Sequence, residues 1–171
     1  MFARDFSIWP AFWLLALLAF TACRNNLPDT NPTTGTVTYQ GEPVAGATVL
    51  FIRGGGTLAA GELAMGQTDA QGRFELTTYV SGQQDASGAM AGEYVVTISK
   101  HIPPRGMSES QYQALVDAAE KIGETGEMAP PEKQPPDPVE MFPERYSMLG
   151  KSELRATVTA DGQNDFRFDL E

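Results

Sequence analysis

The chain has 171 residues, of which 22 are acidic and 12 basic, and its formal net charge is −10. An acidic surface repels phosphate backbones, so the composition argues against a nucleic-acid partner. The 17 glycines and 12 prolines favour many short elements joined by turns, and about 150 residues beyond a leader make a single domain.

Residues 1–22 are predicted to be a secretory signal peptide. Arg4 precedes a run of ten apolar residues, 11–20, and two small residues follow. A membrane-spanning helix needs roughly 20 apolar residues, about twice the length of this run, so we expect a cleaved leader. An uncleaved apolar anchor is the alternative, and both interpretations place the protein at a membrane.

The single cysteine of the chain, Cys23, directly follows this leader. The quartet Phe20-Thr21-Ala22-Cys23 resembles the lipobox of bacterial lipoproteins. The resemblance implies cleavage before Cys23 and lipidation of its thiol, and two or more acyl chains make a firm membrane anchor. Arg24 stands where inner-membrane lipoproteins carry Asp. By this analogy we expect the cell envelope, at the outer membrane facing the periplasm or the exterior.

Polar residues 23–34 are predicted to be a flexible tether, and residues 35–171 a β-sandwich domain. Beyond the tether, apolar and polar side chains alternate as in half-buried strands. The predicted strands are 35–40, 47–53, 73–79, 93–100, 153–159 and 165–171. Strand 47–53 is apolar on both faces, which predicts a central position, and the last two strands are predicted to form a hairpin.

Residues 101–149 interrupt the strand pattern. Ser108 and Gln111 form a capping box, and apolar residues follow at helical spacing, which predicts one amphipathic helix. Its apolar face consists of Tyr112, Leu115, Val116, Ala119 and Ile122, and Gly123 follows. Six prolines among residues 128–146 predict extended chain beyond it. We therefore expect an insertion that the sandwich carries as a contact surface.

Three stretches resemble the carboxypeptidase regulatory-like and transthyretin-like β-sandwich domains. They are GTVTYQGEPVAGATVLF, GQTDAQGRFELTT and GEYVVTISK, within residues 35–100. The resemblance implies an all-β, Greek-key sandwich of about seven strands, prealbumin-like or Ig-like, with the helical and proline-rich insertion before the last two strands. Because these motifs consist of turn and core residues, they specify a fold and leave the function open.

The inventory of reactive side chains argues against an enzyme. His101 is the single histidine, whereas metallocarboxypeptidases, ring-cleaving dioxygenases and hydroxyisourate hydrolases of related folds each need at least two. No Gly-x-Ser-x-Gly turn is present. We predict no catalytic residue, no cofactor and no metal ligand. Asp161, Asn164 and Asp165 leave calcium open as an alternative to an ordinary turn.

Two functions remain open from the sequence. The first is a non-catalytic, lipid-anchored envelope protein whose sandwich is a structural or protein-interaction module, with an envelope protein or a glycan as its partner. The alternative is a module that binds a small molecule or a carbohydrate. Both tryptophans, Trp9 and Trp13, lie in the leader, so the mature chain lacks the commonest sugar-stacking residue. We therefore favour the first.

Overall fold

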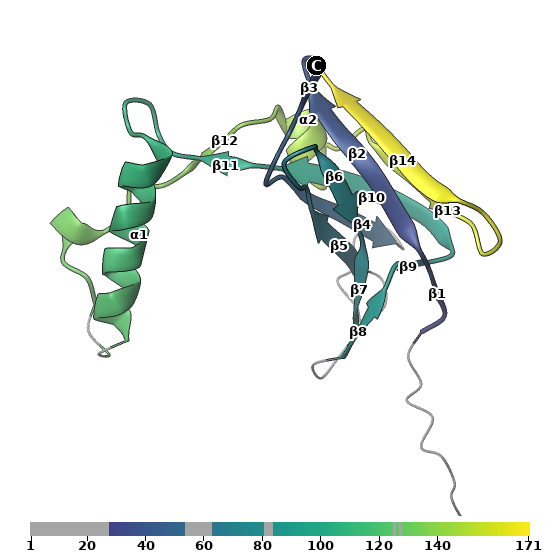
Figure 1. Cartoon of the computed structure of the whole chain (residues 1–171), viewed down its shortest axis with the longest axis horizontal. Coiled ribbons are helices and arrows are strands. Elements are labelled where there is room, and N and C mark those ends of the chain that lie inside the picture. Colours follow the sequence, from purple (N-terminus) through teal and green to yellow (C-terminus); the bar gives the residue numbers. More distant parts are fainter. Residues whose placement is uncertain (1–27, 54–62, 81–83, 125, 127) are drawn as a thin grey trace, which may run out of the picture.

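The computed structural model describes residues 28–53, 63–80, 84–124, 126 and 128–171 (Figure 1). The two largest β-sheets of these residues pack into a sandwich, and a helical arm projects from one side of it. The all-β prediction is confirmed. The helical and proline-rich segment lies before the last two strands, as expected.

The larger sheet has six antiparallel strands within the described residues. Across the sheet these are β13 (Arg155–Val158), β10 (Gly92–Ser99), β4 (Thr48–Arg53), β5 (Leu63–Gln67), β7 (Thr77–Val80) and β8 (Gln84–Ser87). The predicted central strand is β4, between β10 and β5. Ile52, on the face of β4 opposite to the core residue Phe51, is only 3% exposed, which explains apolar residues at both parities.

The smaller sheet contains β14 (Asn164–Leu170), β2 (Thr33–Tyr39) and β3 (Glu42–Pro43), and β6 (Arg73–Glu75) also pairs with β2. Ahead of it, β1 (Thr30–Asn31) pairs with β9 (Ala89–Met90). Residues 30–31 and 33–34, which the sequence assigned to the tether, are therefore strand residues. The tether ends before Thr30.

The predicted hairpin between the last two strands is wrong. β13 pairs with β10 in the larger sheet, whereas β14 runs parallel to β2 in the smaller sheet. Residues 159–163 thus carry the chain from one sheet to the other, and the buried Asn164 fixes this turn because its Oδ1 accepts from the Thr159 amide at 2.9 Å. Alternation shows which face of a strand is buried, but it does not identify the neighbouring strand.

The core lies between the two sheets and is centred on Phe51 of β4. Its ring centroid lies 5.4–6.4 Å from four aromatic rings on three other strands: Phe74 of β6, Tyr94 of β10, and Phe166 and Phe168 of β14. Aromatic pairs of this kind contribute about 0.5–1.5 kcal/mol each beyond the burial of their area. Phe51 therefore packs against both sheets of the sandwich. The sequence predicts the separate strands but not this contact between the sheets.

Tyr94 adds a titratable group to this core. It is 2% exposed, and its hydroxyl donates to the Met90 carbonyl at 2.7 Å. Burial raises the pKa of Tyr94, and the nearby Arg53 and the bond to Met90 only partly oppose this effect. The phenol therefore ionises at higher pH in the folded state than in the unfolded state, where its pKa is about 10.

This difference predicts a loss of stability at alkaline pH. The contribution of Tyr94 is fully present below pH of about 10 and is lost as the pH rises through the native pKa, because the unfolded state releases the proton first. We expect the melting temperature to fall less steeply above that pH in Tyr94→Phe, measured by circular dichroism. The control is Tyr79→Phe, at an exposed tyrosine. Equal slopes in the two variants would contradict the prediction.

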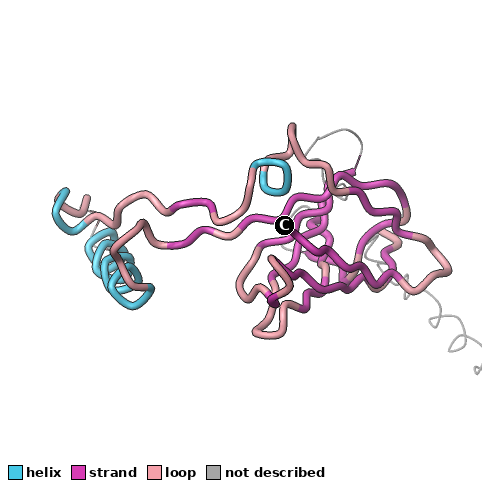
Figure 2. The backbone as a smooth tube through the Cα atoms, turned by 90° about the horizontal axis from the view of Figure 1, so that it is seen from above, coloured by secondary structure: helices cyan, strands magenta, loops and turns pink. Residues whose placement is uncertain are grey.

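The segment 101–149 has two structurally different parts. The described residues between 101 and 140 form the arm, in which β11 (His101–Ile102) and β12 (Val139–Glu140) pair as an antiparallel ribbon that leads away from the sandwich (Figure 2). Residues 141–149 return to the sandwich and include the short helix α2 (Glu144–Ser147). Phe142 and Tyr146 of this second part are buried in the core, so only the first part stands apart.

Candidate functional site

The arm contains the predicted helix, α1 (Glu109–Gly123). The capping box is confirmed: the Gln111 amide donates to Ser108 Oγ at 3.3 Å, and the Ser108 amide donates to Gln111 Oε1 at 2.9 Å. These two bonds satisfy amides that the first turn of a helix leaves without a partner. Local sequence alone is therefore enough to define where α1 begins.

One face of α1 packs inside the arm. The predicted apolar residues on this face are half-buried. The neighbouring element is the 3-10 helix Pro131–Lys133, in the segment that returns from α1 to β12. Ala129 is buried there, and its carbonyl accepts from Gln134 Nε2 at 2.6 Å. Both views show α1 separated from the two sheets (Figures 1 and 2). The apolar face therefore stabilises the arm and not the sandwich.

A second, exposed face of α1 is mostly acidic, and Lys121, the basic residue of the last turn, lies next to it. The residues of this face recur every three or four positions, the spacing of one helical face: Glu109, Gln113, Asp117, Glu120 and Glu124. This acidic stripe follows the whole helix, a length of about 22 Å. Elsewhere on the arm, Met128 and Val139 are two of the large hydrophobic side chains that the sandwich leaves exposed to solvent. The arm thus presents a negative face on α1 and two exposed apolar side chains on the segment that returns to the sandwich.

Glu140 holds the base of the ribbon, a role that the sequence analysis did not assign. Its Oε1 accepts from the Lys100 amide at 3.0 Å and from the Phe142 amide at 3.1 Å. Its Oε2 lies 3.9 Å from Nε2 of His101, whose side chain is largely exposed. His101 is therefore paired across the ribbon. Nothing in the local sequence around Glu140 distinguishes it from other surface carboxylates.

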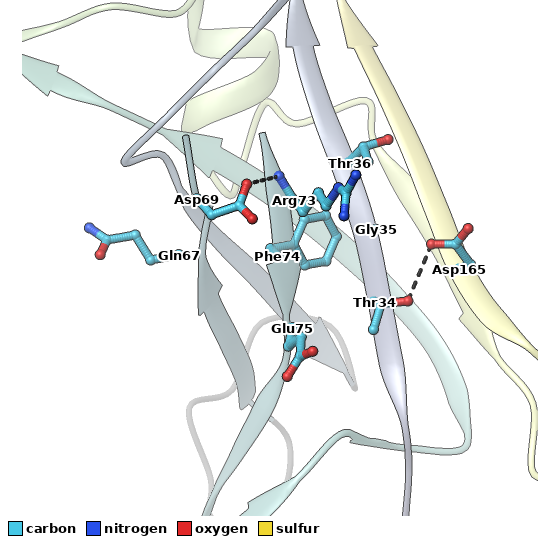
Figure 3. Close-up of a pocket in the computed structure, with 9 residues that line it drawn as sticks. All are labelled: Thr34, Gly35, Thr36, Gln67, Asp69, Arg73, Phe74, Glu75 and Asp165. Atoms are coloured by element: carbon cyan, nitrogen blue, oxygen red, sulfur yellow. Dashed lines mark hydrogen bonds between the residues drawn. The ribbon is translucent and has the colours of Figure 1, made fainter. Parts of the chain in front are cut away.

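A second candidate site lies on the outer face of the smaller sheet. It is a hollow of about 630 Å³ lined by β2, β5, β6, β14 and the turn before β6. The strand register places Thr34 between Glu75 and Asp165, and it places Thr36 between Arg73 and Arg167. Figure 3 shows Glu75 and Asp165 on opposite sides of Thr34. Because the strands come from distant parts of the sequence, no local motif predicts this juxtaposition.

Asp69 lines the same hollow and also shapes the turn before β6. Its Oδ1 accepts from the amides of Gln71 and Arg73, each at 2.8 Å. Gly72 in this turn has a φ of +74°, and a Cβ there would lie 2.5 Å from the Val37 carbonyl oxygen. The prediction that Asp69 caps its own turn is confirmed, and Gly72 is required by both its conformation and the lack of space.

The three residues considered for calcium have separate environments. The side-chain amide of Asn164 is bonded to the backbone of Thr159, with Nδ2 donating to the Thr159 carbonyl at 3.0 Å. Asp165 points to the outer face, where Thr34 Oγ1 donates to its Oδ1 at 3.2 Å, and Asp161 is exposed in the turn. Among the residues that the structure describes, no group of three or more His, Cys, Asp or Glu side chains is arranged to hold a metal ion.

The predicted signal peptide 1–22 and the predicted lipidation site Cys23 lie outside the described residues. Within the described part of the chain, neither α1 nor any other helix has the length and apolar character needed to cross a bilayer. Comparison of the chain with protein families, curated proteins and solved structures finds no match.

Proposed function

We propose that the protein is a non-catalytic, lipid-anchored protein of the bacterial cell envelope whose β-sandwich presents the arm to a protein partner. The observation that carries this proposal is the position of α1: every one of its residues is at least partly exposed, and it stands away from the sheets on a two-stranded ribbon. Residues 35–100 resemble carboxypeptidase regulatory-like domains, which favours a structural role for the sandwich over a catalytic one.

The arm is a defined surface and not a loose loop. Ordering a residue costs about 1–2 kcal/mol of backbone entropy, so an ordered arm of this length needs its own stabilising contacts. The capping box of α1, the bonds to Glu140 at the base of the ribbon and the buried Ala129 supply such contacts. None of them strengthens the core of the sandwich. Their effect is to stabilise the base of the ribbon and the packing within the arm.

The charge of this face indicates the chemistry of the partner. Residues 103–138 contain seven acidic and three basic residues, within a chain whose net charge is −10. Opposite charge on a partner speeds association and disfavours acidic competitors. We therefore assign the arm a partner with a basic protein surface. The exposed Met128 and Val139 are further, apolar contact points elsewhere on the arm.

The predicted lipidation of Cys23 is the basis of the assignment to the envelope. The leader 1–22, the lipobox-like quartet and the absence of Asp after Cys23 are the residues on which this part of the proposal depends. A tether that ends before Thr30 is short, so the sandwich stays close to the membrane. The arm then reaches partners that are in the same membrane or next to it.

Photo-crosslinking from the arm tests the proposed function. A photoreactive phenylalanine analogue replaces Gln113, which is exposed on the acidic stripe, and in a matched variant it replaces Thr157, which is exposed on β13. In native membranes we expect a discrete protein adduct from position 113 that is absent from position 157. Adducts of equal yield from both positions would mean random collision and would contradict the proposal.

A further inference from the structure

The hollow on the outer face of the smaller sheet carries a second binding site, distinct from the arm. We propose that it binds a neutral sugar unit through a pair of neighbouring hydroxyl groups. Its volume of about 630 Å³ lies within the range of about 300–1,000 Å³ that is usual for small-molecule sites. The proposal goes beyond the function of the arm and depends on none of its residues.

The lining offers hydrogen-bonding groups that the described part of the protein leaves without partners. The guanidinium of Arg73 and the carboxylate of Glu75 have no side-chain bond among the described residues, nor does the amide of Gln67. Asp165 uses Oδ1 to accept from Thr34, and its second oxygen accepts no hydrogen bond from the described residues. Donors and acceptors therefore alternate around one hollow (Figure 3).

A pair of adjacent hydroxyls fits this alternation. Each hydroxyl both donates and accepts, so one hydroxyl donates to a carboxylate while its neighbour accepts from the guanidinium. Bonds to charged groups are stronger than bonds between neutral groups. Glu75 and Asp165 supply carboxylates on either side of Thr34, and Arg73 supplies the guanidinium one row along the sheet. The arrangement matches a hydroxyl-rich ring better than an apolar ligand.

The net charge of the lining selects against an anionic ligand. The lining contains three carboxylates, those of Asp69, Glu75 and Asp165, against one guanidinium, that of Arg73, and the exposed Arg167 beside Thr36 is the second guanidinium on this face. A phosphate or an acidic sugar would meet a negative potential there, whereas a neutral sugar meets no such penalty. The excess of carboxylates therefore favours neutral sugars over phosphate-bearing ligands, which an arginine alone would attract.

The backbone makes the hollow a fixed feature of the sheet. A Cβ at Gly66 of β5 would lie 2.2 Å from the Glu75 carbonyl oxygen, so only glycine allows β5 to approach β6 this closely. This approach brings Gln67 and Glu75 to the same hollow. The charged side chains of the lining are exposed to solvent, and its aromatic residue, Phe74, is buried in the core and offers no stacking platform, so we expect weak binding, with a Kd of about 1 mM.

Ligand-observed saturation-transfer NMR tests the site with the full chain in lipid nanodiscs. The neutral probes are maltotriose, mannotriose and chitotriose at about 10 mM, roughly ten times the expected Kd. Trigalacturonate and spermidine serve as anionic and cationic probes. We expect transfer to at least one neutral probe and none to trigalacturonate. Transfer to none of the neutral probes, or to a charged probe alone, would overturn the assignment.

Two matched variants locate the site. Asp165 and Asp169 both lie on the outer face of β14 and both accept a hydrogen bond from a threonine of β2, at 3.2 and 2.6 Å, but only Asp165 lines the hollow. Asp165→Ala should weaken binding of the neutral probe about tenfold, and Asp169→Ala should leave it unchanged. An equal loss of probe binding in both variants would overturn the site. The photo-crosslinked adduct from position 113 of the arm does not depend on either variant, so the two proposals are tested separately.

Discussion

Replacing Phe142 by alanine is expected to destabilise the protein by about 3–5 kcal/mol, the usual cost of truncating a buried phenylalanine. Phe142 is 4% exposed, and its ring lies 5.3 Å from that of Tyr39 on β2 in an edge-on arrangement. Truncation removes this contact and leaves a cavity at one end of the core. The measurement is urea unfolding of residues 24–171, monitored by circular dichroism.

A control for this prediction replaces residues 103–138 by a short glycine-serine linker. Loop length affects stability only weakly, by about 0.6 kcal/mol for each doubling. The linker variant keeps Phe142 and Tyr146, so it should unfold cooperatively with nearly unchanged free energy of unfolding. A linker variant that fails to fold, or a Phe142→Ala variant as stable as the parent, would contradict the division of segment 101–149 into an arm and a core part.

Cys23→Ala is expected to abolish lipid attachment completely and to leave the leader uncleaved. The acylated thiol is the predicted anchor, and each buried methylene of an acyl chain contributes roughly 0.8 kcal/mol to membrane binding. Metabolic labelling with a tagged fatty acid, together with the intact mass, measures both effects. Thr21→Ser keeps a small residue in the lipobox-like quartet and should be labelled like the parent. Equal labelling of Cys23→Ala would contradict the anchor.

Elements that depend on local patterns could be predicted from the sequence. The start of α1 follows from Ser108 and Gln111, which bond to each other across three residues. The central position of β4 follows from apolar residues on both of its faces. In each case the determining side chains are neighbours in the sequence, so their pattern is visible without knowledge of the fold.

Features that depend on long-range pairing could not be predicted. The parallel pairing of β14 with β2 joins residues about 130 positions apart, among them Asp165 and Thr34. The outer hollow exists only because of this register. Phe142 was missed for a different reason: it stands among prolines with no apolar period around it, so its burial against Tyr39 of β2 has no signal in the local sequence.

The central claim is that the acidic stripe of α1 contacts a basic partner. Its most direct test is the yield of the adduct from position 113 after the substitutions Asp117→Asn and Glu120→Gln, compared with Glu93→Gln and Glu153→Gln on the exposed surface of the sandwich. The account predicts that the variant with both stripe substitutions loses most of the adduct, and that raised salt lowers the adduct yield of the parent in the same way. The variant with both sandwich substitutions should retain the yield of the parent. An adduct that survives neutralisation of the stripe would contradict the claim.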